Sequence, residues 1–427
     1  MTPQPLSSLG RALVRSAEAQ VVLWTGVLAA SASLFAVLTA RWLGTADRGV
    51  VVVFLTTSSF LMLIGSLGMG TGGRVLVNQD PPLGIDTYLR HSRNLSIAHL
   101  VTSATLGLGV LALSGGLPEI WAGALFVAYA ALLLWCYLMR ELLHGCGHHR
   151  MAVVSDVVPA VVQTALVGLI YATGNLTLRI TMIVLVVGVA CQTVFLLVQV
   201  HRLPREEVTA DWGLRGVLDF SLPAMFASLG QAFVIRGDRL ILGALAGSSA
   251  VGVYGAAATL TEILWIVPGA VAQVAFRRAS ISSSVTDGRR VRRLTLVLTA
   301  ALGLALVGIA PWAIDLLLGP AYASAKPLIA VLVLASIPMA SYQLDAGVLN
   351  GLGRLKQVST ATVASSAVLI VLCLALVPRW GAMGAAWGSV VAYTLLAAAC
   401  KIHLRRIHRS WVVAEATEAG VPTARGE

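Results

Sequence analysis

Charged side chains are scarce in this sequence. They make up 11% of the 427 residues, whereas hydrophobic residues make up 57%. No soluble globular protein has this balance. Apolar runs of about 20 residues recur along the chain, and runs of that length cross a bilayer as helices. The composition therefore predicts an all-α polytopic membrane protein.

Lysine is nearly absent, so the net charge of +11 comes almost wholly from arginine. The three lysines are Lys326, Lys356 and Lys401, and none stands in a Gly-Lys-Ser/Thr signature, so the chain has no P-loop for ATP hydrolysis. In a soluble protein this excess of positive charge would indicate nucleic acid. In this chain positively charged cytoplasmic loops explain it, and we expect no nucleic-acid partner.

The five cysteines include no CxxC pair, and we expect no disulfide framework. The loops predicted outside the membrane are very short and leave no room for a catalytic domain. We therefore expect neither enzyme activity nor a cofactor. One loop gathers His144, Cys146, His148 and His149, but their spacing fits no zinc pattern, which favours a polar loop over a metal site.

The apolar runs predict twelve spans. The distribution of basic residues predicts that both termini lie on the cytoplasmic side of the inner (plasma) membrane. The spans lie at about 20–41, 49–70, 95–113, 119–140, 151–173, 178–200, 217–244, 249–276, 294–318, 325–349, 358–377 and 382–404. With this topology 23 of the 30 basic residues lie on the cytoplasmic side and 5 on the outside. We expect Met1–Gln20 to form an interfacial helix, and residues 406–427 to be a disordered cytoplasmic tail.

The chain repeats its own turn signals. Gly44 recurs as Gly247, 203 residues on, and Gly174 recurs as Gly381, 207 residues on. The segment Leu143–Gly147 recurs as Leu349–Gly353, 206 residues on. Six spans per repeat predict two parallel bundles, residues 1–200 and 217–405, joined by a cytoplasmic linker at 201–216. Such pairs of repeats commonly hold a substrate between them and open to one side at a time.

Two arginines lie within the predicted seventh span. An Arg at mid-span costs about 2.5–3.5 kcal/mol on insertion scales, and Arg236 and Arg239 are three residues apart, so they share a helix face. We therefore expect them to line a wet cavity that receives an anion. The alternative is a helix-end ion pair, in which Asp238 neutralises part of the charge.

Three further charged positions are candidates. Arg74 follows a glycine-rich helix end, where backbone N–H groups and a guanidinium could meet a phosphate; a loose helix end with a cytoplasmic Arg explains the pattern equally well. Asp156 and Asp345 lie within predicted spans, where carboxylates carry protons or form ion pairs. Asp238, Asp156 and Asp345 are thus candidates for coupling or for ion pairing.

Several segments together resemble the Wzx-type polysaccharide flippases, over nearly the whole chain. They are Ala40-Arg41-Trp42-Leu43-Gly44 with Asp47-Arg48-Gly49, Ser66-Leu67-Gly68-Met69-Gly70-Thr71 with Arg74, Asp238-Arg239-Leu240-Ile241-Leu242-Gly243 with Val251-Gly252-Val253-Tyr254, and Ala272-Gln273-Val274-Ala275-Phe276. The sequence departs from that family at Arg277, where the family usually has proline.

The resemblance implies the multidrug/oligosaccharidyl-lipid/polysaccharide exporter (MOP) fold, with two six-helix bundles in a V around a central cavity. It implies a flippase that moves undecaprenyl-pyrophosphate-linked oligosaccharide from the inner to the outer leaflet by alternating access, for assembly of cell-surface polysaccharide. Its partners would be the lipid-linked substrate, membrane lipid and a polysaccharide polymerase. Arg236 and Arg239, with Arg74 and Arg41, would bind the anionic pyrophosphate.

Two other functions stay open. A cation-coupled multidrug exporter would share the fold, but should have a more acidic cavity. A membrane glycan polymerase or ligase would need polar catalytic loops outside the membrane, and the sequence has none of useful length.

Overall fold

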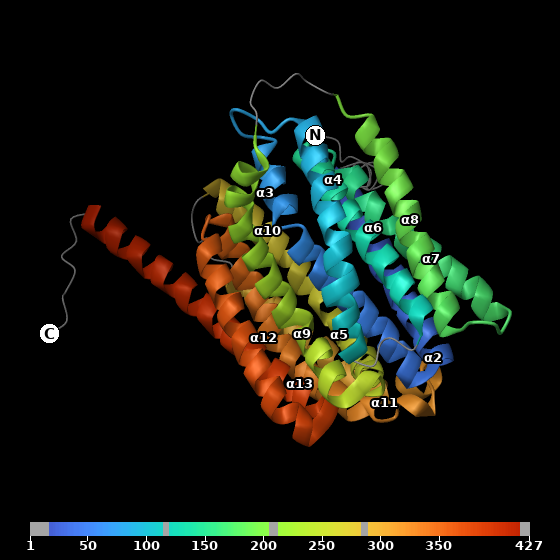
Figure 1. Ribbon diagram of the computed structural model, residues 1–427. Helices are drawn as coiled ribbons and strands as arrows, with labels where there is room; N and C mark the ends of the chain where they lie inside the picture. Colours follow the sequence, from blue (N-terminus) through green and yellow to red (C-terminus); the bar gives the residue numbers. More distant parts are fainter. Residues whose placement is uncertain (1–16, 114–118, 205–211, 283–288, 419–427) are drawn as a thin grey trace, which may run out of the picture. The chain divides into compact units, whose positions relative to one another are not determined.

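A computed structural model describes residues 17–113, 119–204, 212–282 and 289–418, and within these ranges all regular secondary structure is helical (Figure 1). The first half contains α2 (Ala17–Gly65), α3 (Met69–Leu76), α4 (Ile85–Thr102), the π-helix η1 (Ser103–Gly107), α5 (Leu108–Leu113), α6 (Ile120–Gly145), α7 (His149–Ala172) and α8 (Leu178–His201). The second half contains α9 (Leu214–Glu262), the 3-10 helix η2 (Ile263–Trp265), α10 (Ile266–Ser282), α11 (Arg289–Leu317), the 3-10 helix η3 (Pro320–Tyr322), α12 (Ala325–Gly351) and α13 (Leu355–Glu418).

The described residues form twelve spans. Nine helical segments are long and apolar enough to cross a membrane. Three of them contain a break at Gly44, Gly247 or Gly381, where φ is +74°, +81° and +53°. A side chain at such a φ clashes with the backbone, so glycine is the residue that lets the chain turn back. Dividing three of the nine segments at these turns gives the predicted twelve spans.

The turns also confirm the internal repeat. Gly44 and Gly247 have nearly the same backbone conformation, with ψ of −178° and 172°. The ends of α6 and α12 match as well, since Gly147 and Gly353 both have a positive φ and the same three backbone hydrogen bonds close each helix. The two halves therefore share their fold, one six-span repeat following the other.

The chain divides into two compact units that do not coincide with the repeats. Unit 1 contains Met1–Leu229 and Gly243–Ala256, and unit 2 contains Gly230–Leu242 and Ala257–Glu427. The long helix α9 therefore contributes to both units. The predicted bundle boundaries at 200 and 217 and the V-shaped arrangement stay predictions.

In unit 1, α9 meets α2 at a close crossing, which we call the outer crossing. A Cβ on Gly49 would lie 1.7 Å from the carbonyl oxygen of Ser248, and a Cβ on Gly252 would lie 1.9 Å from that of Thr45. The hydroxyl oxygens of Thr45 and Ser249 lie 2.9 Å apart in a hydrogen bond. Only glycine at 49 and 252 allows the two backbones to approach this closely.

The outer crossing follows the symmetry of the repeat. With the offset of 203 residues, Thr45 is equivalent to Ser248 and Gly49 to Gly252. Gly49 packs against Ser248, and the equivalent Gly252 packs against Thr45, which is the residue equivalent to Ser248. This is the pattern of a self-complementary contact about a two-fold axis, here a pseudo-two-fold axis within one chain.

The other helices pack against neighbours within their own unit. In unit 1, α2 packs on α7, and α6, α7 and α8 lie side by side (Figure 1). In unit 2, α12 packs on α10, α11 and α13.

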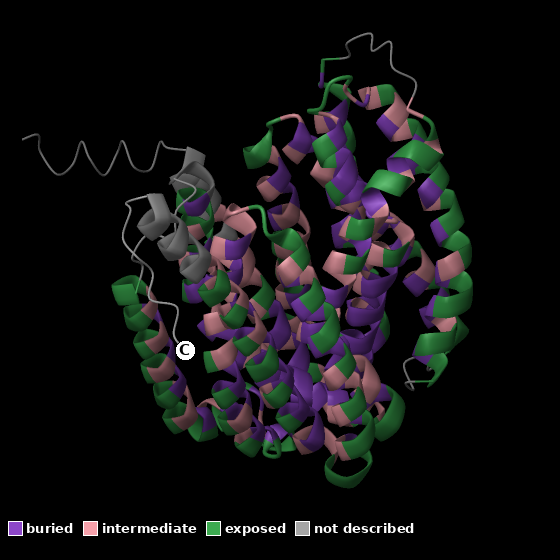
Figure 2. Cartoon of the chain, turned by 90° about the vertical axis from the view of Figure 1, so that its left-hand side faces the viewer, coloured by how far each residue is buried: buried purple, intermediate pink, exposed green. Residues whose placement is uncertain are grey.

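Large apolar side chains are exposed along the spans. Leu169 on α7, Leu304 on α11 and Val371 on α13 are 67%, 74% and 65% exposed. Figure 2 shows exposed and buried residues alternating along the long helices. Exposing this much apolar surface to water is unfavourable, whereas lipid acyl chains cover it at no cost in free energy. The protein is a multi-pass membrane protein.

The ends of the chain differ from expectation in one respect. Helix α13 continues to Glu418, so residues 406–418 of the predicted disordered tail are helical instead. Residues 419–427 lie outside the described residues, as do 1–16 of the predicted interfacial helix and 205–211 of the predicted linker.

Candidate functional site

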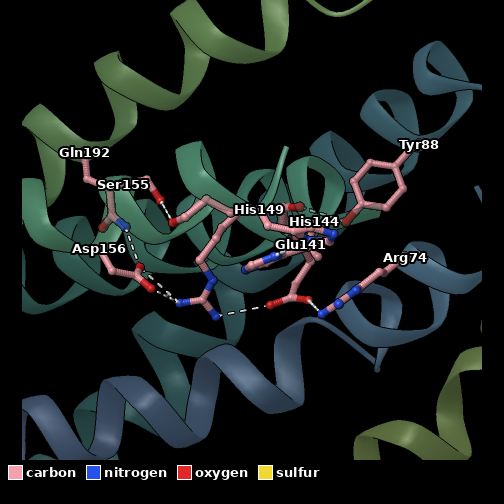
Figure 3. A network of polar contacts seen from close by, with 11 residues as sticks. Arg74, Tyr88, Glu141, His144, His149, Ser155, Asp156 and Gln192 are labelled. Carbon is pink, nitrogen blue, oxygen red and sulfur yellow. Dashed lines mark hydrogen bonds and ion pairs between the residues drawn. The ribbon is translucent and has the colours of Figure 1, made fainter. Parts of the chain in front are cut away.

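Unit 1 contains a network of polar contacts among four charged side chains and one amide, which we call the unit 1 ion network: Arg74, Arg140, Glu141, Asp156 and Gln192 (Figure 3). Arg140 Nη1 donates to both carboxylate oxygens of Asp156 at 3.0 Å, and its Nη2 donates to Glu141 Oε1 at 3.3 Å. Gln192 Nε2 donates to Asp156 Oδ1 at 3.1 Å. Glu141 Oε2 lies 3.6 Å from Arg74 Nη1. Two guanidinium groups thus balance two carboxylates.

The hairpin between α6 and α7 brings these groups together. Residues 145–148 form the turn, in which Gly147 has φ +80° and His148 N–H donates to Leu143 C=O at 2.8 Å. Arg140 lies shortly before this turn and Asp156 shortly after it, so the two side chains meet across the antiparallel pair. The spacing from a turn therefore fixes this ion pair.

The network is open at one end. The Arg74 side chain is 45% exposed, whereas that of Glu141 is 13% exposed. The Arg74–Glu141 pair is also the longest contact in the network, and an exposed pair of this length contributes little to stability. An incoming anion could therefore replace Glu141 at Arg74 while Arg140 still holds the carboxylate.

The histidine-containing loop lies beside this network. His144 Nδ1 and His149 Nδ1 lie 3.2 Å apart, with ring centroids 5.5 Å from one another. Cys146 caps the end of α6, where its backbone N–H donates to Leu142 C=O at 2.9 Å. Among the described residues, no three His, Cys, Asp or Glu side chains converge as a set of metal ligands.

The predicted anion site on α9 belongs to unit 2. Arg239 is buried and forms an ion pair with Glu262, the last residue of α9, beyond the turn at Gly247. Asp238 is also buried, and its carboxylate accepts hydrogen bonds from Ser389 Oγ and from the Arg239 backbone N–H, at 2.9 and 2.8 Å. Asp238 therefore anchors α9 to α13, and Arg239 joins the two arms of the turn at Gly247.

Arg236 differs from Arg239 in its exposure. It is exposed, and within unit 2 no hydrogen bond or ion pair of its guanidinium is found among the described residues. The charges that act on it are those of Arg239, Glu262 and Asp238. Arg236 lies eleven residues before the turn at Gly247, about 16 Å along the helix, so it is placed well within the span.

The other predicted residues lie apart from these groups. Asp345 on α12 is buried and accepts a hydrogen bond at 3.2 Å from Arg292 at the start of α11, and Arg292 also donates to Ser341 Oγ at 2.6 Å. Arg41 is exposed on α2, three residues before the turn at Gly44. Of the predicted residues, Arg236, Asp238 and Arg239 come from one cluster on α9, and Arg74 and Asp156 belong to the unit 1 ion network. The roles of all seven stay predictions.

Comparison with known proteins now places this architecture. A family model described as "Polysaccharide biosynthesis protein" matches residues 148–327. A solved structure of the lipid II flippase MurJ in an inward closed conformation aligns with a TM-score of 0.75 at 10% identity, covering 90% of this chain and 87% of that one. An inward-facing multidrug resistance MATE family transporter of the MOP superfamily aligns with a TM-score of 0.70 at 13% identity, covering 91% and 98%.

The protein has the MOP fold. A third structure, a ligand complex of the MATE multidrug transporter DinF-BH, has a TM-score of 0.62 at 18% identity and covers 92% of this chain and 95% of that one. No curated protein matches the sequence. The fold predicted from the sequence is confirmed, and so is the predicted resemblance to a polysaccharide biosynthesis family.

Sequence reasoning missed several residues of these polar groups in the MOP fold. Glu141 was not among the candidates, although an Arg-Glu pair near the end of an apolar run is a usable signal. Arg140 and Arg292 were read only as cytoplasmic charges. Ser389 carries no signal at all, since its role depends on which face of α13 packs against α9.

Proposed function

We propose that this protein is a flippase that moves undecaprenyl-pyrophosphate-linked oligosaccharide from the inner to the outer leaflet by alternating access, for assembly of a cell-surface polysaccharide. The protein would be a transporter and not an enzyme. It would lie in the inner membrane with both termini in the cytoplasm, and a polysaccharide polymerase would use its product.

The observation that carries the proposal is the exposed Arg236 inside a span of a MOP-fold protein. A guanidinium placed there needs water or an anionic partner, because lipid solvates it poorly. Pyrophosphate offers paired oxygens that a guanidinium can bind through two hydrogen bonds. The match to a polysaccharide biosynthesis family supports a glycan-bearing lipid as the source of that anion.

The neighbouring residues fit the same role. The Arg239–Glu262 pair and the Asp238–Ser389 hydrogen bond fix the segment that carries Arg236. Because the helix that carries Arg236 is held in this way, anion binding has to order the Arg236 side chain but not its backbone, which favours affinity. Arg74 would meet the head group first, at the side predicted to be cytoplasmic, in exchange for Glu141.

The test is a comparison of Arg236→Ala with Arg236→Lys in cells whose chromosomal copy is deleted. Arg379→Ala is the matched control, since Arg379 is an exposed arginine of unit 2 close to the turn at Gly381. Lipid-linked glycans are extracted and assigned to a leaflet by their accessibility to a membrane-impermeant glycosidase. We expect Arg236→Ala to lower outer-leaflet glycan at least tenfold at equal protein level, and Arg236→Lys to retain part of it. Full export in Arg236→Ala would overturn the assignment.

A multidrug exporter is the second candidate, favoured by the alignment with MATE transporters at 95% and 98% coverage of their chains. It predicts that deletion increases sensitivity to cationic dyes and leaves the lipid-linked glycans in their normal leaflet. That pair of results would replace the flippase proposal.

A further inference from the structure

Unit 1 contains a cavity lined by none of the arginines proposed to bind the transported substrate. It has a volume of about 480 Å³ and is lined by residues of α4, α6 and α8. Helix α6 packs against both of the others, and all three are visible together in Figure 1. The cavity lies at the end of the helices that is predicted to be cytoplasmic.

The end of this cavity that is predicted to be cytoplasmic carries net positive charge. Asp86, Arg90 and Arg93 line it from one face of α4, at i, i+4 and i+7, and His201 lines it from the end of α8. Two guanidinium groups outweigh one carboxylate there. Arg93 lies about 12 Å along α4 from its start at Ile85, so the positive charge reaches the predicted start of the third span at about residue 95.

The inner part of the cavity is apolar and continues onto surface that lipid must cover. Trp135 on α6 and Leu197 on α8 line it, and Trp135 lies about 15 Å from the end of α6. Leu197 is 47% exposed, and Ile97, one turn beyond Arg93 on α4, is 59% exposed. An occupant would therefore meet two arginines at one end and open acyl-chain surface at the other.

We propose that this cavity binds the head group of an anionic glycerophospholipid of the inner leaflet. Its phosphate would bind Arg90 and Arg93, its glycerol region would lie against Trp135, and its acyl chains would follow Leu197 and Ile97 into the bilayer. Basic pockets between spans on the cytoplasmic side are typical sites for such lipids. Tryptophan is also the residue that membrane proteins place at the level of the head groups. A free anion would use the arginines but would leave the apolar surface unexplained.

The test measures lipid binding by the purified full-length protein. Protein in detergent is titrated with phosphatidylglycerol, cardiolipin or phosphatidylcholine, and retained lipid is counted by native mass spectrometry. Near an anionic surface each basic residue strengthens binding by roughly fivefold. We therefore expect Arg90→Gln/Arg93→Gln to weaken binding of phosphatidylglycerol and cardiolipin by about thirtyfold, and to leave the weaker binding of phosphatidylcholine unchanged.

Two further variants keep the result interpretable. Arg150→Gln/Arg354→Gln removes the same charge from two other helix ends predicted to be cytoplasmic, and should bind anionic lipid like the wild type. Leu197→Trp enlarges a half-exposed side chain into the cavity without changing charge, and should also weaken retention. If Arg90→Gln/Arg93→Gln does not fold, Leu197→Trp decides alone.

Two outcomes would overturn the proposal. One is equal retention of anionic lipid by the wild type and by both cavity variants. The other is displacement of bound phosphatidylglycerol by undecaprenyl phosphate at a much lower concentration, which would make the cavity a site for the transported lipid. The assay needs no transport, so its result is independent of whether the flippase proposal holds.

Discussion

The outer crossing of α2 and α9 makes a sharp prediction about stability. Replacing Gly49 by Ala would place a Cβ 1.7 Å from the Ser248 carbonyl oxygen, where an ordinary contact needs 3.4 Å or more. Backbone atoms cannot rotate away, so the two helices would have to separate by about 1.7 Å. That movement breaks the 2.9 Å hydrogen bond between Thr45 and Ser249. Overpacking of about 1–3 kcal/mol and one lost hydrogen bond of about 1 kcal/mol give a destabilisation of about 2–4 kcal/mol.

The control for this substitution lies on the same helix. A Cβ on Gly26 would meet no atom within 4 Å, so Gly26→Ala should leave stability unchanged or raise it slightly. Thermal unfolding in detergent can be followed with a thiol-reactive dye, because Cys136, Cys373 and Cys400 are buried in the folded protein. If Gly49→Ala unfolds at the same temperature as Gly26→Ala, the close approach of the two backbones is wrong.

The pseudo-symmetry also predicts how Gly49→Ala and Gly252→Ala combine in a double variant. Gly252→Ala should be about as destabilising as Gly49→Ala, since its Cβ would lie 1.9 Å from the Thr45 carbonyl oxygen. One separation of the helices relieves both clashes. The double variant should therefore lose clearly less stability than the two single variants together. Additive losses would mean that the two glycines act at separate contacts.

Two further predictions use the same unfolding assay. Arg140→Gln removes the guanidinium that donates to both oxygens of the Asp156 carboxylate and should destabilise the protein by about 1–3 kcal/mol. Adding Asp156→Asn should restore part of this stability. A larger loss in the double variant than in Arg140→Gln would contradict the ion pair. Gly247→Ala forces a side chain into a turn with φ +81° and ψ 172° and should cost about 1–3 kcal/mol. An unchanged unfolding temperature would contradict that backbone conformation.

The spans and the repeat could be predicted from the sequence because their signals are local. A run of about 20 apolar residues is long enough to cross a bilayer wherever it occurs. Gly44 and Gly247 mark turns because only glycine readily takes their backbone conformation. Both signals need no knowledge of which helices become neighbours, so the fold followed from them.

The polar pairings could not be predicted, because they depend on how each helix is rotated against its neighbours. Arg239 was expected to share a cavity with Arg236, one turn away, yet its side chain pairs with Glu262 across the turn at Gly247. Asp238 looked like a partial counter-charge for the two arginines, and Ser389 on α13 is one of its partners. A sequence shows that a charge is present within a span, but not which helix supplies the group that balances it.

The two repeats agree in their turns and differ in their polar bonds. With the offset of 204 residues between the starts of α4 and α11, Tyr88 corresponds to Arg292. Tyr88 donates to the Leu138 carbonyl oxygen at 2.8 Å, whereas Arg292 donates to the carboxylate of Asp345 on α12. Each bond ties the third span of its repeat to the fourth, but only the second one uses charge.

The same divergence holds for the close contacts of glycine. At the outer crossing both repeats supply glycine, so the contact is symmetric. At the other end of α2 and α3, Gly68 and Gly72 approach Ser221, while the offset of 203 places Val271 and Ala275 at the equivalent positions of the second repeat. Neither of those residues permits so close an approach. We infer that both repeats contribute alike to the outer crossing, whereas the contact of Gly68 and Gly72 with Ser221 has no such counterpart in the second repeat. Substitutions at Gly49 and at Gly252 should therefore lower the stability of the protein by similar amounts, whereas substitutions at Gly72 and at Ala275 should lower it by different amounts.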